Sequence, residues 1–379
     1  MIYVQHLLGI GHLQRSAYLA TELVREDFEV QLVSGGLPQQ FPLDEAIQLR
    51  QLPPVYSPDG SFTRLLDANG NHIDSHWQDG RKQQLLEFFV SFAPQVLITE
   101  TFPFGRRMMR FELIPLLEAA KSSTRCLQVI ASIRDIIQPK TKPGREQEIC
   151  ELIDQFYDHV LVHGDEKIAR LVDSFNLAEH IDDKVAYSGY ICPNNPVLPS
   201  AQDGIDEVLV SAGGSVTGFQ ILKTAIEARP LCRLKHLKWR ILVSHSISDS
   251  LFEELQQLAT EGIRVERNRP DFSELVKRAS LSISQAGYNT ITDILNSDTE
   301  AVVIPYAEAD ELEQTTRAQK LQDIGRVIML RQAELNATAL ADAIDRTSGL
   351  HTSFTVNLAG ATNSANLISQ WLLDASNQN

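Results

Sequence analysis

The chain has 379 residues, 43% of them hydrophobic and 22% charged, which is typical of a globular protein with room for two domains. Its formal net charge of −15 argues against nucleic acid as a partner, because nucleic acid requires a basic surface, and it weakens the case for docking on anionic lipid. The four cysteines show no CxxC spacing, so neither a zinc site nor a disulfide framework is indicated.

The N-terminal residues do not form a charged leader followed by an apolar segment, as a secretory signal would. No apolar run in the sequence approaches the about 20 residues that span a bilayer. We therefore expect a cytoplasmic protein without a transmembrane segment.

The first half of the sequence alternates strand and helix patterns, and it opens as a βαβ unit of the Rossmann type. The dinucleotide fingerprint is incomplete, because Gln14 stands where its third glycine belongs and no acid ends the second strand; an NAD enzyme is therefore not expected. Residues 52–80 are expected to form an extended surface segment. Strands are expected at residues 2–8, 28–33, 95–99, 125–133, 159–162 and 184–187, and helices at 13–25, 81–93, 106–120 and 147–157.

Three prolines between residues 193 and 199 exclude a helix or a central strand, so residues 192–202 are predicted to be a linker. The second half then repeats the same alternation. The sequence thus predicts an α/β fold with two facing Rossmann-like domains, residues 1–191 and 203–379, and a cleft between them. In the second half, strands are expected at residues 207–211, 239–244, 263–266, 281–283, 301–304 and 326–330, and helices at 219–228, 250–260, 272–278, 315–324, 333–345 and 364–373, with a further helix opening near residue 288.

Residues 281–317 contain the most informative pattern in the chain. A short strand is followed by Gly287 and by a helix opening at Tyr288, so free backbone N–H groups can face an anion such as a diphosphate. Asp293 lies one turn inside that helix, where a carboxylate suits a ribose hydroxyl rather than a phosphate. The pattern indicates a nucleotide-sugar pocket, although any α/β domain also contains strand–glycine–helix turns.

A second glycine turn follows the first strand of the second half, at Gly213, Gly214 and Ser215. Glycines allow a phosphate to approach the backbone, and the serine hydroxyl can donate a hydrogen bond to it. A P-loop is excluded because no Gly-Lys-Ser/Thr follows. His245 ends the next strand, where it either lines the nucleotide side or caps the turn.

His12 follows the first strand of the chain, in the turn Gly9-Ile10-Gly11-His12. This position lies at the carboxyl edge of the sheet, where α/β proteins bind ligands. The positive end of the helix lowers the pKa of a histidine there, which favours a neutral imidazole able to take a proton. A capping or core histidine is the alternative.

Arginines gather at the same expected edge. Arg106 and Arg107 follow the strand that ends near Glu100, and Arg134 with Asp135 ends the next strand. Guanidinium groups bind carboxylate and phosphate well, so the cluster suggests an anionic acceptor. The alternative is a surface network between these arginines and the many acidic residues.

Taken in order, the Gly-His loop, the Gly-Gly-Ser loop and the Gly–Asp–Pro–Gln stretch resemble GT-B glycosyltransferases of family 28. The resemblance is to the N-acetylglucosaminyltransferase of the lipid stage of peptidoglycan synthesis and to bacterial "predicted glycosyltransferases". It implies a GT-B fold, a C-terminal helix that packs back on the first domain, and an inverting, metal-independent transfer of a sugar from a nucleotide-diphosphate donor, with UDP as the expected nucleotide. No cofactor is implied, and the acceptor hydroxyl belongs to a small molecule, a lipid or a glycan.

In this interpretation His12 is the catalytic base, and the remaining candidates divide between the two ligands. The acceptor would be bound by Gly11, Arg15, Glu100, Phe104, Arg106, Arg107, Arg134 and Asp135. The donor would be bound by Gly213, Gly214, Ser215, His245, Gly287, Tyr288, Asn289, Thr290, Asp293, Glu313 and Gln314.

Two alternatives remain open. The spacing Gly-x-Gly-His-x-x-Arg, with His12 and Arg15, is also similar to sugar-nucleotide hydrolases of the pseudaminic acid pathway. A nucleotide-sugar hydrolase or epimerase on the same two-domain plan is therefore the alternative enzyme, and a sugar-nucleotide-binding subunit is the alternative without catalysis. The arginine cluster departs from the pattern of the peptidoglycan enzyme, so a lipid-linked muramyl peptide is not implied as the acceptor.

Overall fold

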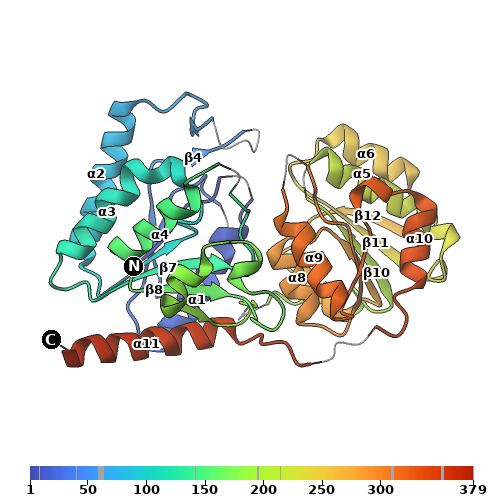
Figure 1. The fold of residues 1–379 in the computed structure, drawn as a ribbon. Helices are drawn as coiled ribbons and strands as arrows, with labels where there is room; N and C mark the ends of the chain where they lie inside the picture. The colour runs from blue at the N-terminus through green and yellow to red at the C-terminus, as the bar shows by residue number, and fades with distance from the viewer. Residues whose placement is uncertain are drawn as a thin grey trace. The chain divides into compact units, whose positions relative to one another are not determined.

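The computed structural model describes residues 1–7, 9–39, 41–58, 64–140, 142–193, 196–213, 215–308, 311–350 and 354–378. The chain forms two compact units (Figure 1). Unit 1 consists of Met1–Asn194 and Ala359–Asn379, and unit 2 consists of Asn195–Leu358. No helix among the described residues is both long enough and apolar enough to cross a membrane.

Unit 1 is built on a parallel sheet in which the described strands follow the order β3-β2-β1-β6-β7-β8-β9. Its strands are β1 (Ile2–Val4), β2 (Gln31–Ser34), β3 (Gln48–Gln51), β6 (Val96–Glu100), β7 (Gln128–Arg134), β8 (His159–His163) and β9 (Val185–Tyr187). Its helices are α1 (Gly11–Arg25), α2 (Ser75–Phe92), α3 (Arg110–Ser122), α4 (Arg145–Phe156) and α11 (Gly360–Gln378), with 3-10 turns η1 (Arg107–Met109), η2 (Leu171–Asp173) and η3 (Ala178–Lys184).

Alternate residues of each strand point to opposite faces of this sheet, and each face carries its own core. Tyr3 and Leu97 pack with α2, α3 and α4 on one face. Ile2 and Ile98 pack with α1 and α11 on the other. Strands that are buried on both faces explain the continuous apolar runs in the sequence.

Helix α11 returns the end of the chain to unit 1, where it packs against α1 and β7. The close approach needs a glycine, because a Cβ at Gly360 would lie 2.3 Å from the carbonyl oxygen of Gly189. The ring of Trp371 stacks on His159 with 3.8 Å between their centroids. The observed boundary therefore differs from the expected second domain of residues 203–379, because residues 359–379 belong to unit 1, as the implied return of the C-terminal helix requires.

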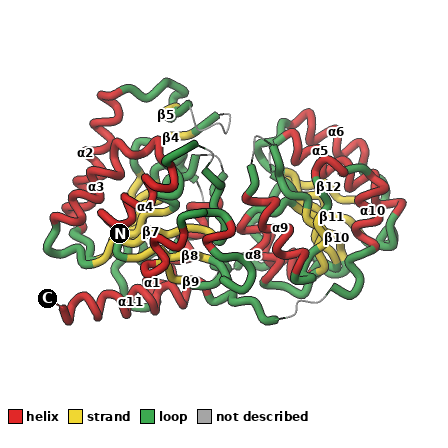
Figure 2. The backbone as a smooth tube through the Cα atoms, in the orientation of Figure 1, coloured by secondary structure: helices red, strands yellow, loops and turns green. Residues whose placement is uncertain are grey.

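Unit 2 contains a second parallel sheet, whose described strands follow the order β12-β11-β10-β13-β14-β15 and are flanked by helices (Figure 2). Its strands are β10 (Glu207–Ser211), β11 (Lys238–Val243), β12 (Ile263–Arg267), β13 (Leu281–Ser284), β14 (Glu300–Val303) and β15 (Ile328–Met329). Its helices are α5 (Val216–Ala228), α6 (Asp249–Leu258), α7 (Phe272–Arg278), α8 (Tyr288–Leu295), α9 (Glu313–Asp323) and α10 (Ala337–Asp345), with 3-10 turns η4 (Arg229–Leu231) and η5 (Gln332–Glu334). One apolar core cluster of unit 2 includes Val208, Trp239 and Ile283, and other buried residues such as Leu209, Ile291 and Leu321 lie outside it.

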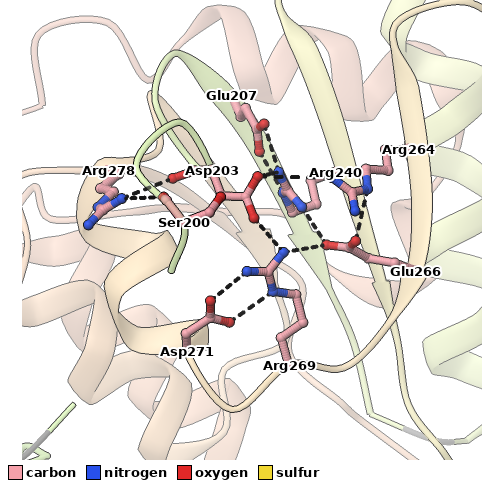
Figure 3. Close-up of polar contacts among 9 residues, drawn as sticks. All are labelled: Ser200, Asp203, Glu207, Arg240, Arg264, Glu266, Arg269, Asp271 and Arg278. Atoms are coloured by element: carbon pink, nitrogen blue, oxygen red, sulfur yellow. Dashed lines mark hydrogen bonds and ion pairs between the residues drawn. The ribbon is translucent and has the colours of Figure 1, made fainter. Parts of the chain in front are cut away.

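A buried ionic network ties the start of unit 2 to its sheet (Figure 3). Arg240 of β11 is only 2% exposed and donates hydrogen bonds to Glu207, Asp203 and Glu266. Arg269 joins the same group through Asp203 at 2.7 Å. A buried guanidinium is tolerated only when several carboxylates compensate its charge, so these contacts fix the segment before β10 against β11 and β12.

In the first half, the structure differs in detail from two of the predicted elements. The segment 52–80 contains a short antiparallel strand pair, β4 (Val55–Tyr56) with β5 (Leu66–Asp67). Helix α2 begins at Ser75 instead of residue 81, because the Asp74 side chain caps its N-terminus by accepting a hydrogen bond from the main-chain N–H of Trp77. The expected helix at 106–120 is divided into η1 and α3, and Arg106, which directly precedes η1, adopts a left-handed conformation with a φ of 57°.

Candidate active-site residues in the two units

The candidate base and its partner come together because β1 and β6 are adjacent parallel strands. Their register pairs Ile2 with Ile98 and Tyr3 with Thr99. The segment after β1, which leads into α1, and the end of β6 therefore meet at the carboxyl edge of the sheet. This arrangement places His12, at the start of α1, beside Glu100, the last residue of β6.

His12 and Glu100 form a hydrogen-bonded pair. Nδ1 of His12 lies 2.7 Å from Oε1 of Glu100. The same carboxylate oxygen also accepts a hydrogen bond from Arg15, and another from the Thr101 hydroxyl at 2.7 Å. The side chain of Glu100 is 1% exposed, whereas that of His12 is 15% exposed.

The electrostatics of the pair favour a carboxylate next to a neutral imidazole. Burial alone would raise the pKa of Glu100, but the attraction of His12, Arg15 and Arg106 outweighs it and holds that pKa well below its usual range. Burial lowers the pKa of His12 to about 3, although Glu100 acts in the opposite direction. A carboxylate can only accept, so Nδ1–H donates to Glu100, and Nε2 becomes the nitrogen that can take a proton.

Two arginines add positive charge at this edge. Arg106 and Arg134 both act to lower the pKa of His12. Arg106 also donates from Nε to the main-chain carbonyl of Gln5 at 2.7 Å, so its guanidinium is held beside the end of β1. Burial lowers the pKa of Arg106, and repulsion from Arg134 and Arg15 contributes to this shift.

Two other acceptor candidates do not belong to this group. The ring of Phe104 is 1% exposed and packs edge-on against Phe175 in the core, so it cannot contact an acceptor. Arg107 is exposed and pairs with Glu148 at 3.2 Å, a residue that also binds Arg110 and Arg145. For Arg107 the surface network is therefore the better description.

Asp135 and His163 lie deeper in unit 1. Asp135 is fully buried and accepts hydrogen bonds from the Ile136 N–H at 2.8 Å and the Tyr190 hydroxyl at 3.2 Å. His163 lies between the hydroxyls of Ser132 and Ser188, at 2.8 and 3.0 Å. Burial lowers the pKa of His163 to about 3, as expected for a neutral core histidine.

In unit 2, the two glycine turns meet because β10 and β13 are neighbours in the sheet. The N–H of Gly213 donates to Oε1 of Gln285 at 2.8 Å, which links the two turns directly. Ser215 caps α5, and its hydroxyl accepts from the Gly218 N–H at 3.1 Å. Only glycine fits at 218, because a Cβ there would lie 1.9 Å from the Gly213 carbonyl oxygen. The candidate Gly214 lies outside the described residues.

The start of α8 has the features of an anion site. Gly287, which has no side chain, is its N-cap, and a Cβ at Gly287 would meet no atom of the described residues within 4 Å. Arg317 holds the turn from beneath, donating to the Ala286 carbonyl at 3.0 Å and to Glu313 at 2.9 Å. The helix start is therefore supported from the core side.

The other candidates near α8 differ in their exposure. Asn289 and Thr290 are partly buried in its first turn, whereas Tyr288 is buried near Arg317. Asp293 is 8% exposed, and burial raises its pKa to about 7, although Ser273 and the charge of Lys277 act in the opposite direction. A carboxyl group with such a perturbed pKa is typical of functional sites.

The loop that leads to α9 is held by the residues expected to bind the sugar. Glu313 is buried against Arg317, and Oε1 of Gln314 accepts from the Tyr306 N–H at 3.1 Å. Both side chains thus have structural partners, and Asp310 of this loop lies outside the described residues. His245 is exposed, and its Nε2 lies 3.3 Å from the Asn268 carbonyl oxygen.

Sequence reasoning missed Thr101 and Gln285. Thr101 directly follows β6, and its φ of 67° is rare for a residue other than glycine. Gln285 lies between β13 and Gly287. Both occupy strand ends at the carboxyl edge of a parallel sheet, and this position is the signal that could have found them.

The same region of unit 2 carries a family signature. Residues 208–368 match the family model described as "Glycosyltransferase family 28 C-terminal domain". The match begins in β10, contains both glycine turns and extends into α11.

Curated relatives match over shorter stretches. The UDP-N-acetylglucosamine--N-acetylmuramyl-(pentapeptide) pyrophosphoryl-undecaprenol N-acetylglucosamine transferase of Rippkaea orientalis is 37% identical over 70 residues, which cover 18% of this chain and 20% of the relative. The protein of the same name from Methylococcus capsulatus is 27% identical over 167 residues, or 41% of this chain and 46% of the relative. The chain thus spans less than half of the length of these two relatives.

Solved structures match nearly the whole chain. The glycotransferase of kitacinnamycin has a TM-score of 0.63 at 16% identity and covers 98% of each chain. MurG from Acinetobacter baumannii has a TM-score of 0.53 at 14% identity, with coverage of 97% and 99%. Os79 from O. sativa, in complex with UDP, has a TM-score of 0.62 at 12% identity, with coverage of 98% and 100%. Residues 208–368 thus match the family 28 C-terminal domain, and the chain as a whole has the α/β fold of these GT-B glycosyltransferase structures.

Proposed function

We propose that the protein transfers a sugar from a nucleotide-diphosphate donor to an acceptor hydroxyl, with inversion at the anomeric carbon and without a metal ion. The observation that carries this proposal is the pair His12–Glu100, in which a buried carboxylate holds a neutral imidazole at the edge of the sheet. General bases of this kind contribute about 10²–10⁴-fold to a rate. The family domain in unit 2 supports the choice of a sugar donor.

The reaction would be a single displacement. The acceptor oxygen attacks the anomeric carbon, the bond from that carbon to the diphosphate breaks, and the acceptor proton passes to Nε2 of His12. Glu100 orients the ring and stabilises the imidazolium that forms, as the carboxylate of a catalytic triad does. Arg15 and Thr101, which also bind Glu100, keep this carboxylate in place.

The donor would bind to the two glycine turns of unit 2. The N-termini of α5 and α8 would present a positive helix end to the diphosphate, which would stabilise its charge as it leaves. Asp293 would accept a hydrogen bond from the ribose. UDP is the expected nucleotide, which the names of the curated relatives and the UDP complex of Os79 support; the rhamnosyltransferase SpnG is instead complexed with thymidine diphosphate, so both nucleotides need to be tested.

The acceptor would bind to unit 1, near Gly11 at the start of α1. The charges of Arg106 and Arg134 beside His12 support an acceptor that carries a phosphate or carboxylate. Guanidinium groups bind such anions through paired, charge-assisted hydrogen bonds.

Product analysis of the purified full chain tests this function. The protein is incubated with UDP- and TDP-sugars, each with and without a panel of hydroxyl acceptors, and the products are identified by mass spectrometry and NMR. The proposal predicts acceptor-dependent release of the nucleotide and a glycoside of inverted configuration, unaffected by EDTA. Full-rate release of free sugar without acceptor, or an epimerised donor, would instead identify the hydrolase or epimerase, and binding without turnover would identify a sugar-nucleotide-binding subunit.

A further inference from the structure

A polar pocket lies in unit 2, beside the start of α5. It is lined by Thr217, Gln220, Thr224, Glu308, Gln332 and Leu335 and has a volume of about 280 Å³. Pockets that enclose drug-sized ligands have volumes of about 300–1,000 Å³, so this one suits a single ring rather than a complete nucleotide sugar.

The centre of the pocket is the carboxylate of Glu308. Its Oε1 accepts hydrogen bonds from the Thr217 hydroxyl and from Nε2 of Gln332 at 3.2 Å, and the Tyr306 hydroxyl lies 3.3 Å from Oε2. The hydrogen bond from Thr217 holds the pKa of Glu308 below its usual value, so the group is ionised at neutral pH. An ionised carboxylate accepts about four hydrogen bonds, which leaves capacity for a hydroxyl of a ligand.

The loop that carries Glu308 is fixed on both sides. Gln314 of α9 accepts from the N–H of Tyr306 at 3.1 Å, and Oε1 of Gln332 accepts from the N–H of Ala307 at 3.1 Å. Gln332 therefore holds both the backbone of the loop and the carboxylate that follows it. A carboxylate fixed in this way is preorganised for recognition, because little conformational entropy remains to be lost when a ligand binds.

The chemistry of the lining indicates the class of ligand. Five of the six residues present hydroxyl, amide or carboxylate groups, and Leu335 adds one apolar contact. Such a surface matches the hydroxyls of a sugar ring better than an aromatic base. The described residues of the lining include one negative charge and no arginine or lysine, so they disfavour a second carboxylate in the pocket.

The position of the pocket connects it with the donor. Thr217 belongs to the first turn of α5, whose N-cap Ser215 is part of the glycine turn assigned to the diphosphate. In a nucleotide sugar, the sugar is bonded directly to the diphosphate. We propose that this pocket receives the sugar ring of the donor and that Glu308 determines specificity, by accepting from the hydroxyls of a neutral sugar and repelling a uronic acid. This assignment rests on the function proposed above.

Calorimetry with the full chain and four probes tests the assignment: UDP, UDP-glucose, UDP-N-acetylglucosamine and UDP-glucuronate. Glu308→Gln should leave the affinity for UDP unchanged and weaken the better-bound neutral UDP-sugar by about 5–10-fold, the loss expected when a charged acceptor becomes neutral. The same variant should raise the affinity for UDP-glucuronate by at least about 5-fold, because the repulsion between Glu308 and the carboxylate of the ligand is removed. Glu253→Gln, on the exposed side of α6, is the matched control and should change none of the four affinities.

The outcomes separate this inference from the proposed function. If UDP binds and Glu308→Gln changes the affinities for all four ligands equally, or changes none of them, the pocket does not hold the sugar. In that case the inference fails while the proposed function stands. If neither UDP nor any of the UDP-sugars binds to the wild-type chain, and the TDP-sugars also fail, the donor site itself is absent. Thermal melting of each variant without ligand shows whether a loss of affinity reflects loss of folding.

Discussion

Oε1 of Glu100 lies 2.7 Å from Nδ1 of His12, although 88 positions separate the two residues in the sequence. The contact exists because β1 and β6 are neighbours in a parallel sheet, so the chain segments that leave their carboxyl ends lie side by side. Glu100 also accepts hydrogen bonds from Arg15 and Thr101, and the imidazole is more exposed than the side chains of Glu100 and Arg15.

If this pair acts as a unit, Glu100→Gln and His12→Ala should each lower the single-turnover rate by about 10²–10⁴-fold. The double variant should be no slower than the slower single variant, because residues of one catalytic unit show strongly non-additive effects. Donor affinity should stay unchanged in all three variants, since the donor is assigned to unit 2. Additive losses in the rapid-quench experiment would mean that the two residues act independently.

Arg106 and Arg107 offer a matched pair of variants. Arg106→Ala should raise the KM for a phosphorylated acceptor by about 10–100-fold, the range for a lost hydrogen bond to a charged group. Added salt should also raise this KM in the wild type, because it screens the same attraction. Arg107→Ala should leave KM unchanged, because its guanidinium pairs with Glu148. Steady-state kinetics with a sugar phosphate and its neutral parent sugar provides the test. Equal use of both acceptors by the wild type would argue against an anionic acceptor.

Asp293 predicts a pH dependence of stability. Burial raises its pKa from 3.8 to about 7, so between these pH values the folded chain holds a proton that the unfolded chain releases. The stability that the protonated carboxyl group contributes to the folded chain is therefore fully present below about pH 4, and it is lost as the pH rises to about 7. At about 1.4 kcal/mol per pKa unit, Asp293→Asn should stabilise the protein above pH 7 by about 2–4 kcal/mol and have little effect near pH 4.

Denaturant unfolding of the wild type and of Asp293→Asn at pH 4.5 and pH 8 measures this difference. The same substitution should weaken UDP binding at pH 8 by about 1.5–3 kcal/mol, because an ionised acceptor for the ribose is lost. If the variant is more stable but binds UDP normally, the raised pKa of the buried Asp293 is confirmed and its contact with the ribose is refuted.

The ionic network in unit 2 predicts a contrast between two arginines. Arg240 is 2% exposed and Arg264 is 62% exposed, yet both pair with Glu266. Arg240→Ala should destabilise the protein by about 3–5 kcal/mol, since it leaves buried carboxylates uncompensated. Arg264→Ala should cost less than about 1 kcal/mol, as is usual for exposed ion pairs. Similar free energies of unfolding for both variants would mean that the network does not stabilise unit 2.

The sequence predicted those features that depend on local patterns. The alternation of strand and helix patterns indicated two Rossmann-like units, and glycine turns after strands marked the carboxyl edges where His12, Ser215 and Gly287 lie. The position of the last helix on unit 1 depends on contacts between residues that are far apart in the sequence, such as Gln128 and Trp371. A local pattern carries no information about such contacts, so the domain boundary was placed by the linker alone.

Side-chain roles were less predictable than positions. Phe104 and Arg107 follow the same strand as Glu100, but one turns into the core and the other pairs with Glu148. Glu308 was not identified, because its significance depends on Thr217 and Gln332, which lie on other elements. A carboxylate in an acidic loop has no distinguishing signal until the sheet brings those partners to it.

The most direct test of the account is a comparison of the wild type with His12→Ala, using UDP- and TDP-sugars in the presence of the acceptor panel. The products are read by mass spectrometry, and the affinity of both proteins for the free nucleotide is measured by calorimetry. The account predicts an inverted glycoside from the wild type only, with equal nucleotide affinity for both proteins. Glycoside formation at the wild-type rate by His12→Ala, or sugar release by the wild type that does not depend on an acceptor, would contradict it.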